Sequence, residues 1–253
     1  MIAARALPGI GEVRRGDDLA ALLAATRGDG GFAPGDVLVI AHKIVSKAEG
    51  RVVALADVQP SARAVELAAA LGKDDPRPVE VVLRETAEVV RAAHGVMICR
   101  THHGFVCANA GVDASNAAAR DELILLPVDP DASARALRAA LGRAGAGSPA
   151  IVIADSFGRA WRHGQCDVAV GIAGLAPLED WRGRTDAHGR ELRATWIAVA
   201  DQAAAAADLA RGGKDAGEPA VLVTGLDRHV LPAGDDGPGA AALVRSREED
   251  LFA

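Results

Sequence analysis

The sequence predicts an α/β protein of the mixed α+β kind, and three observations support this. Short apolar runs, such as those within 35–45 and 149–158, alternate with segments whose apolar residues recur at helical spacing. The chain has 253 residues, of which half are hydrophobic, so it can bury a sizeable core. Aromatic residues make up only 3% and Tyr is absent, so aliphatic side chains must build that core. Strands and helices mixed in this way favour an α/β or α+β architecture.

The first half of the chain predicts two helices among several short strands. The helix at 16–26 should begin near Asp17 or Asp18, where a carboxylate meets free backbone amides. The helix at 61–72 has Ser61 as its expected N-cap and Gly72 as its expected end. The expected strands lie at 2–6, within 35–45, and as a pair at 94–100 and 104–112.

The second half repeats the alternation of strands and helices. The predicted order is a strand at 123–130, a helix at 131–145, a buried strand within 149–158 that ends at Asp155, a strand at 167–175, a helix within 195–213 and a last strand at 218–226. We find no internal repeat, and the one loose connection is a Gly- and Pro-rich segment at 231–242.

Charge and cysteine content exclude several classes of function. The net charge is −6 and no long Lys or Arg run occurs, so we expect no nucleic-acid partner. Apolar stretches are short and interrupted by charge, so we expect no membrane span. An odd count of three cysteines without a CxxC pair is typical of a reduced, cytoplasmic protein. The phosphate-loop, GxGxxG and GxSxG motifs are absent as well.

Two aspartates are the first candidates for chemistry. Asp155 follows the apolar run AIVIA and precedes Ser156, and a carboxylate beside a hydroxyl suits Mg²⁺ or Mn²⁺. Asp113 lies in NAGVDASN, three residues before Asn116, so the two would share one face of a helical turn. The structural alternatives are a helix N-cap for Asp155 and a polar turn for Asp113.

Basic residues supply candidates for anion binding. Lys43 and Lys47 are four residues apart and suit phosphate oxygens, although a solvated helix edge would give the same spacing. Arg159, Arg162 and His163 lie close together, and two arginines can hold a phosphate or a carboxylate. From the residues alone, the sequence indicates a metal-dependent enzyme that acts on phosphates.

Taken in order, these motifs resemble the F420-0:glutamyl ligase family. The blocks that carry the resemblance are LPGIGEVRRGDDL, GDVLVIAHKIVSKAEGR, HGFVCANAGVDASN, LLPVDPDASARALR, IVIADSFGRAWRHGQCDVAVGIAGL, DWRGRTDAHGREL and LVRSREEDLF. They run nearly from end to end of the chain. The resemblance implies a mixed α/β fold particular to the family and a single catalytic region over 1–253, which two interleaved subdomains could make up. It also implies a homodimer, and no C-terminal flavin-reductase-like domain is expected.

The resemblance also implies an activity and a set of residues. Members of the family add L-glutamate to F420-0 with GTP and a divalent cation, Mg²⁺ or Mn²⁺, and a monovalent cation such as K⁺ can take part. Residues carried over as nucleotide contacts are Leu7, Pro8, Gly9, Ile10, His42, Lys47, Asn116, Gly212 and Gly213, and those carried over as metal ligands are Asp113, Asp155 and Ser156. The expected catalytic set is Asp113, Asp155, Lys47 and Arg159.

The chain departs from the family pattern at two positions. His42 stands among positions where the family usually has Ser, Thr or Gln, and Gly213 stands where it commonly offers Gln or Glu to a metal. Two other functions stay open: a ligase of the same scaffold with another phosphorylated acid or amino acid, and a non-catalytic deazaflavin- or nucleotide-binding protein.

Overall fold

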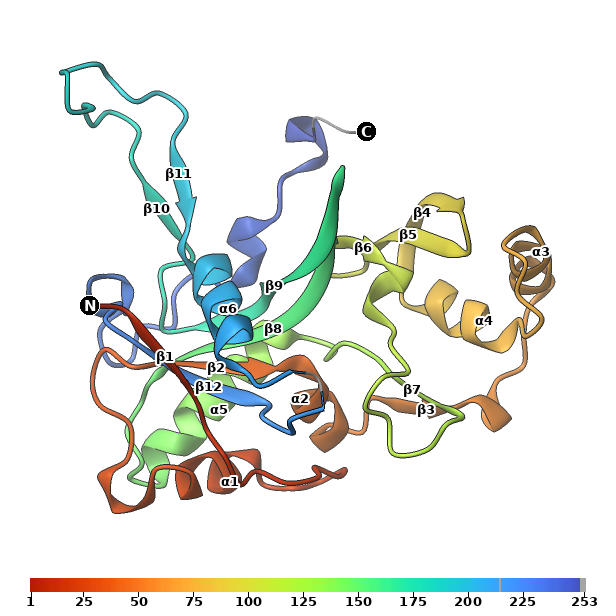
Figure 1. Ribbon diagram of the computed structural model, residues 1–253, viewed down its shortest axis with the longest axis horizontal. Helices are drawn as coiled ribbons and strands as arrows, with labels where there is room; N and C mark the ends of the chain where they lie inside the picture. Colours follow the sequence, from red (N-terminus) through yellow and green to blue (C-terminus); the bar gives the residue numbers. More distant parts are fainter. Residues whose placement is uncertain (214, 251–253) are drawn as a thin grey trace.

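The computed structural model describes residues 1–213 and 215–250 and confirms the predicted mixture of helices and strands (Figure 1). The helices are α1 (Leu19–Ala25), α2 (His42–Ala48), α3 (Ala62–Ala70), α4 (Arg77–Arg84), α5 (Pro130–Arg143) and α6 (Val199–Ala210). The strands are β1 (Ala3–Ala6), β2 (Val37–Ala41), β3 (Val52–Ala54), β4 (Thr86–Ala93), β5 (Val96–Thr101), β6 (Val106–Ala108), β7 (Glu122–Ile124), β8 (Ala150–Arg159), β9 (Arg162–Ala173), β10 (Leu178–Asp180), β11 (Trp196–Ala198) and β12 (Ala220–Thr224). The end of the closing block, residues 251–252, lies outside the described residues.

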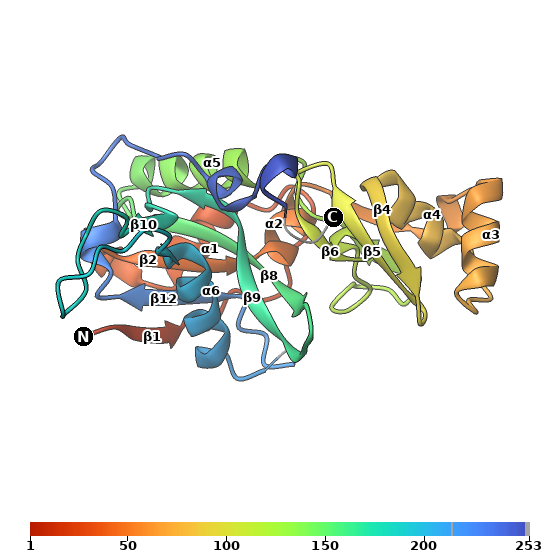
Figure 2. The same cartoon turned by 90° about the horizontal axis from the view of Figure 1, so that it is seen from above.

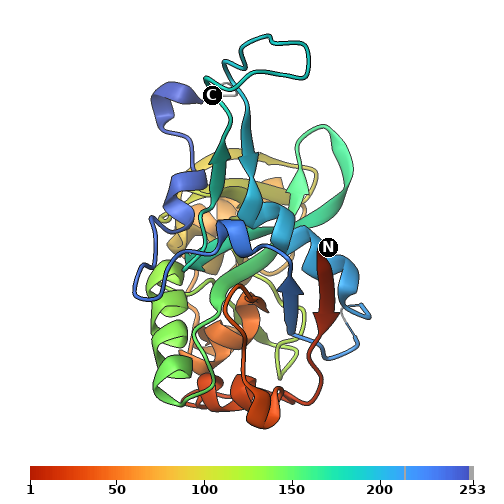
Figure 3. The ribbon, with the colours of Figure 1, turned by 90° about the vertical axis from the view of Figure 1, so that its left-hand side faces the viewer.

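The main lobe is a five-stranded sheet between two layers of helix. Its strand order is β1-β12-β2-β8-β9, in which β2 and β8 are parallel and the other neighbours are antiparallel. One face packs on α1 and α5 through leucines such as Leu23 and Leu141. The other face packs on α6, whose buried stripe is alanine and therefore lets the helix lie close to the sheet. Figure 3 shows α5 in light green on one side of the sheet and α6 in blue on the other.

A second lobe is inserted between α2 and α5. It contains α3, α4, a three-stranded sheet β4-β5-β6 and the pair β3-β7. Its cores are aliphatic clusters around Ala68, Met97 and Leu123. Figures 1 and 2 show this lobe on the right, beside the main sheet. The caps predicted for the two early helices are confirmed, because Asp18 and Ser61 accept hydrogen bonds from backbone amides of α1 and α3.

Strand β9 forms one edge of the main sheet. Two of its backbone amides that do not pair with β8 donate hydrogen bonds to aspartate side chains instead. The amide of Ala169 donates to Asp201 over 2.9 Å, and the amide of Ile172 donates to Asp131 over 2.7 Å. The ladder between β8 and β9 shifts register between Ile153 and Ala154. A carboxylate acceptor therefore lies on each side of this irregularity.

Several predicted bounds were wrong, two of them because of a long-range pairing. The strand predicted at 123–130 is only Glu122–Ile124. The strand within 149–158 does not end at Asp155 but continues to Arg159, because β9 pairs with it beyond the reach of β2. The strand within 35–45 ends at Ala41, where α2 begins. The helix within 195–213 begins only at Val199, because the three residues before it pair with β10.

Strands β10 and β11 form the base of an arm that projects from the main lobe (Figure 1). On this arm the guanidinium of Arg182 lies 4.3 Å from the centre of the Trp196 ring. No helix in the described part of the chain is long and apolar enough to cross a membrane.

Candidate active site

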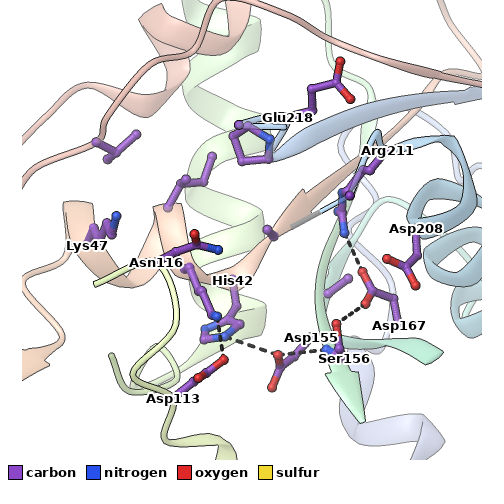
Figure 4. Close-up of a pocket in the computed structure, with 18 of the residues that line it drawn as sticks. His42, Lys47, Asp113, Asn116, Asp155, Ser156, Asp167, Asp208, Arg211 and Glu218 are labelled. Carbon is purple, nitrogen blue, oxygen red and sulfur yellow. Dashed lines mark hydrogen bonds and ion pairs between the residues drawn. The ribbon is translucent and has the colours of Figure 1, made fainter. Parts of the chain in front are cut away.

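A cavity of about 330 Å³ lies where β2 ends and α2 begins, facing the second lobe (Figure 4). The last residue of β2, Ala41, pairs with Ala154 of β8. The residues that follow this pair, His42 at the start of α2 and Asp155 within β8, line the cavity. The carboxyl ends of parallel strands form a crevice in which ligands of α/β proteins commonly bind.

His42 and Asp155 face each other in the cavity wall. His42 Nε2 lies 3.4 Å from Asp155 Oδ1, and His42 Nδ1 lies 3.3 Å from Ser46 Oγ. His42 is only 1% exposed, and within residues 1–213 and 215–250 its Nε2 has no hydrogen-bond partner. This buried nitrogen therefore relies on its contact with the Asp155 carboxylate to offset the cost of its burial.

A chain of polar contacts extends from Asp155 across the β8–β9 ladder. Asp155 Oδ1 accepts a hydrogen bond of 2.8 Å from the amide of Ser156. Ser156 Oγ donates to Asp167 Oδ1 over 2.6 Å, and Asp167 Oδ2 accepts from Arg211 over 2.6 Å. The Asp167 side chain is 2% exposed, so its pairing with Arg211 satisfies a buried charge. Each side chain in this wall is therefore held by its neighbour.

The second lobe contributes Asp113, which stands on an extended segment bridged to Ile124. The predicted helical turn from Asp113 to Asn116 was therefore wrong, and Asn116 has a left-handed φ of 60°. Lys43 Nζ of α2 lies 2.6 Å from Asp113 Oδ2. Burial acts to raise the pKa of Asp113, but hydrogen bonds from Lys43 and Ser115 outweigh it and lower the pKa to about 2. Asp113 is thus ionised at neutral pH and able to attract a cation.

Lys47 lines the cavity from the next turn of α2. It is buried, and its Nζ lies 2.6 Å from Glu12 Oε1, so it is not on the solvated helix edge that was the alternative. The segment next to Lys47 is Gly11–Val13 rather than the predicted residues 7–10, which do not line the cavity. Leu7 and Ile10 are instead buried in the main core.

The glycine loop after α6 closes another side of the cavity. Gly213 lines it, and the Gly212 amide donates to Glu218 Oε2 over 2.8 Å. Asp215 and Glu218 line it too, so this loop does offer carboxylates although Gly213 carries no side chain. Arg159, by contrast, stands at the exposed end of β8, where its guanidinium donates to the carbonyl of His163, and it does not line the cavity.

The described lining of the cavity carries an excess of negative charge. Its acidic residues are Glu12, Asp113, Asp155, Asp167, Asp208, Asp215 and Glu218, and its Lys and Arg residues are Lys43, Lys47 and Arg211. No three His, Cys, Asp or Glu side chains within 1–213 and 215–250 gather closely enough to hold an ion by themselves. An ion here would complete its shell with the Ser156 hydroxyl, water or phosphate oxygens, as Mg²⁺ commonly does, and the donor set fits such an ion.

Comparison with known proteins decides the family. A family model described as F420-0:Gamma-glutamyl ligase matches residues 9–225. The Coenzyme F420:L-glutamate ligase of Methanothermobacter thermautotrophicus is 44% identical over 243 residues, which cover 95% of this chain and 94% of that protein. The chain belongs to the F420-0:gamma-glutamyl ligase family. The resemblance noted from the sequence is thereby confirmed.

Two further members of the ligase family match over nearly their whole length. The Coenzyme F420:L-glutamate ligase of Methanopyrus kandleri is 45% identical over 242 residues, covering 95% of this chain and 93% of its own. The protein of the same name from Natronomonas pharaonis is 44% identical over 253 residues, covering 98% and 93%.

The structure adds cavity residues that the sequence did not single out for this ligase-family chain. Asp167 and Arg211 are the clearest, because they form the buried pair behind Ser156. Asp167 could have been found from its place opposite Ser156 if the strand register had been known. Arg211 and Glu218 flank the glycine loop, and only the fold brings them to the cavity.

Proposed function

We propose that this protein is a ligase that joins L-glutamate to F420-0, using GTP and a divalent cation. Family membership over residues 9–225 and near-full-length relatives named for this ligation support the reaction class and the acceptor. The cavity supports the use of a charged nucleotide together with a cation. The acceptor is a phosphorylated deazaflavin that carries a lactyl carboxylate, and this carboxylate receives the glutamate.

The observation that carries the proposal is the charge of the cavity. Its described lining holds seven carboxylates against three Lys and Arg side chains. A nucleoside triphosphate brings further negative charge, and like charges in a partly buried site repel strongly. Such a ligand binds here only together with cations, which supports dependence on Mg²⁺ or Mn²⁺.

The residues that would hold the cation come from both lobes. Asp155 and Ser156 stand on β8, and Asp113 approaches from the second lobe (Figure 4). Lys43 Nζ lies 2.6 Å from Asp113 Oδ2. A divalent cation bound to Asp113 would therefore have to share its carboxylate with the ammonium group of Lys43. A bound divalent ion supplies charge neutralisation for the phosphates during transfer.

The remaining polar residues position the reactants. Lys47 would exchange its contact with Glu12 for a contact with a phosphate oxygen. The Glu12 side chain is more than half exposed, so it can rotate towards water when the phosphate binds. The lactyl carboxylate attacks the γ-phosphorus of GTP, releasing GDP and forming an acyl phosphate. The glutamate amine then attacks the acyl carbon, loses a proton and expels inorganic phosphate. In both steps the chain contributes chiefly orientation and electrostatic stabilisation.

A direct assay tests the proposal. The protein is incubated with F420-0, L-glutamate, GTP and Mn²⁺, and the product is followed by mass spectrometry. We expect a gain of one or more glutamyl units, its loss after exhaustive chelation, and its return with added Mn²⁺. Replacing GTP by ATP should lower kcat/KM. Unchanged F420-0 would refute the acceptor, activity after chelation would refute the metal, and equal kcat/KM values would refute the preference for GTP.

Other expectations from the family stay predictions. They are a homodimer, a cytoplasmic location and a stimulating effect of K⁺. Each can be measured separately from the ligation assay, by solution mass, by cell fractionation and by replacing K⁺ with Na⁺.

A further inference from the structure

Strands β8 and β9 extend well past the rest of the main sheet. The parallel partner β2 stops at Ala41, opposite Ala154, whereas the β8–β9 pairing continues to Arg159 and Arg162. The outer part of this hairpin is therefore a two-stranded ribbon with exposed residues at 158–165. Figures 1 and 3 show the ribbon, in green, curving away from the sheet.

The base of the ribbon is part of the cavity wall. Ser156 on one strand and Gln165 and Asp167 on the other line the cavity. The tip at Trp161 lies six residues beyond Asp155, which is about 20 Å along an extended strand. A ligand with one end in the cavity and an elongated body could follow the ribbon outwards.

The tip carries a large aromatic residue in an uncommon conformation. Trp161 is 82% exposed, in a chain where aromatic residues are only 3% of the total. Its φ of 57° lies in the left-handed region, which bulky residues rarely adopt and which glycine adopts freely. The indole is therefore presented at the ribbon tip, largely exposed to solvent.

Two arginines lie within two residues of Trp161 in the sequence. Arg159 and Arg162 are paired across the end of the ladder, and both are exposed. The guanidinium of Arg159 is held by the carbonyl of His163, so its orientation is set in advance. Indole rings stack on flat ring systems, and planar guanidinium groups pair with ring oxygens, so both residue types suit a flat, oxygen-bearing ring.

We propose that the ribbon tip binds the deazaflavin ring of the acceptor, with the ring stacked on Trp161 and its oxygens within reach of Arg159 and Arg162. This inference rests on the proposed function and adds a subsite to it. The acceptor is elongated, with its ring at one end and its reactive carboxylate at the other. A ring at the tip is thus consistent with a carboxylate beside Asp155.

Substitutions at Trp161 separate a binding role from a structural one. Trp161→Ala should raise the KM for F420-0 about tenfold, corresponding to about 1.4 kcal/mol, in the range known for aromatic stacking. The kcat and the KM for GTP should stay within about twofold. Trp161→Phe keeps a flat ring and should restore most of the affinity. Trp161→Gly relieves the left-handed φ, so it should melt no lower than Trp161→Ala while binding F420-0 equally poorly.

The matched control is Trp196→Ala, which removes a half-exposed tryptophan from the arm instead of the ribbon. Its KM for F420-0 should not change. A KM for Trp161→Ala within about twofold of wild type would overturn the proposal, as would an equal loss in the control. A Trp161→Phe variant that binds F420-0 as poorly as Trp161→Ala would also overturn it.

A binding measurement keeps this test independent of turnover. If the wild-type protein fails to ligate glutamate, the proposed function fails, but calorimetry with F420-0 still tests the subsite. Binding that weakens about tenfold in Trp161→Ala supports the ribbon subsite. Equal dissociation constants in the two proteins, or no binding to wild type, refute it.

Discussion

Replacing Asp155 with Asn should remove catalysis while leaving the fold intact. The Asp155 side chain is 14% exposed, and its Oδ1 accepts the Ser156 amide over 2.8 Å and faces His42 over 3.4 Å. Asn keeps the size and the acceptor oxygen but loses the charge. The fold then loses only the charge-assisted part of one hydrogen bond, about 1 kcal/mol.

The catalytic loss should be much larger than the loss of stability. An oriented electrostatic contact in an active site typically contributes about 3–4 kcal/mol to transition-state stabilisation, or roughly a hundred- to thousandfold in kcat. Single-turnover ligation at saturating Mn²⁺ and thermal melting should be measured on the same samples, with Asp29→Asn as an exposed control outside the cavity. A kcat within about threefold of wild type, a difference of only ~0.65 kcal/mol, would refute the assignment of Asp155 as a metal ligand.

The remaining predictions concern Asp113, Lys47 and assembly. Because its pKa is lowered to about 2, Asp113 stabilises the fold fully above its ordinary value of 3.8 and loses that contribution as pH falls towards 2. The difference in free energy of unfolding between wild type and Asp113→Asn, measured from urea midpoints, should therefore be constant near neutral pH and decrease below about pH 4. A difference that increases below about pH 4 would contradict the ion pair between Asp113 and Lys43. Lys47→Met should raise the KM for GTP about tenfold, as loss of about 1.4 kcal/mol requires, and a KM within about twofold would count against a phosphate contact. Light scattering should give twice the 25.8 kDa chain mass, and an active species of single-chain mass would disprove the dimer.

Much of the fold followed from local patterns in the sequence. Apolar runs located β2, β8 and β12, and the capping residues Asp18 and Ser61 located the starts of α1 and α3. Some of the predicted bounds were wrong because pairing with a distant strand decides where the element begins or ends. Nothing within residues 149–158 indicates that β9 will extend the strand past Asp155, because that pairing depends on the register of the whole hairpin.

The candidate site was predicted in part for the same reason. Asp113, Asp155, Ser156, Lys47 and Asn116 do line one cavity, although they come from separate parts of the chain. Their roles in binding stay predictions. The contacts behind them could not be read from local sequence, because they form only when the strands and α2 are in place.

The buried pair Asp167–Arg211 illustrates this limit. Ser156 and Asp167 are opposite one another only after the register shift between Ile153 and Ala154. Arg211 reaches Asp167 from the end of α6, on another layer of the fold. The contacts of Asp167 depend on both the register shift between β8 and β9 and the position of the end of α6. The residues next to Asp167 in the sequence therefore give no indication of its role.

The occupied edge of β9 restricts how two copies of this chain could associate. An exposed strand edge is a template for pairing with another strand. Along β9, the carboxylates of Asp131 and Asp201 already take the amides of Ile172 and Ala169, so an incoming strand would find those donors engaged. The opposite edge, β1, is only four residues long. A continuous intermolecular sheet through either edge of the main sheet is therefore disfavoured, on the β9 side by the same aspartates that shape the strand.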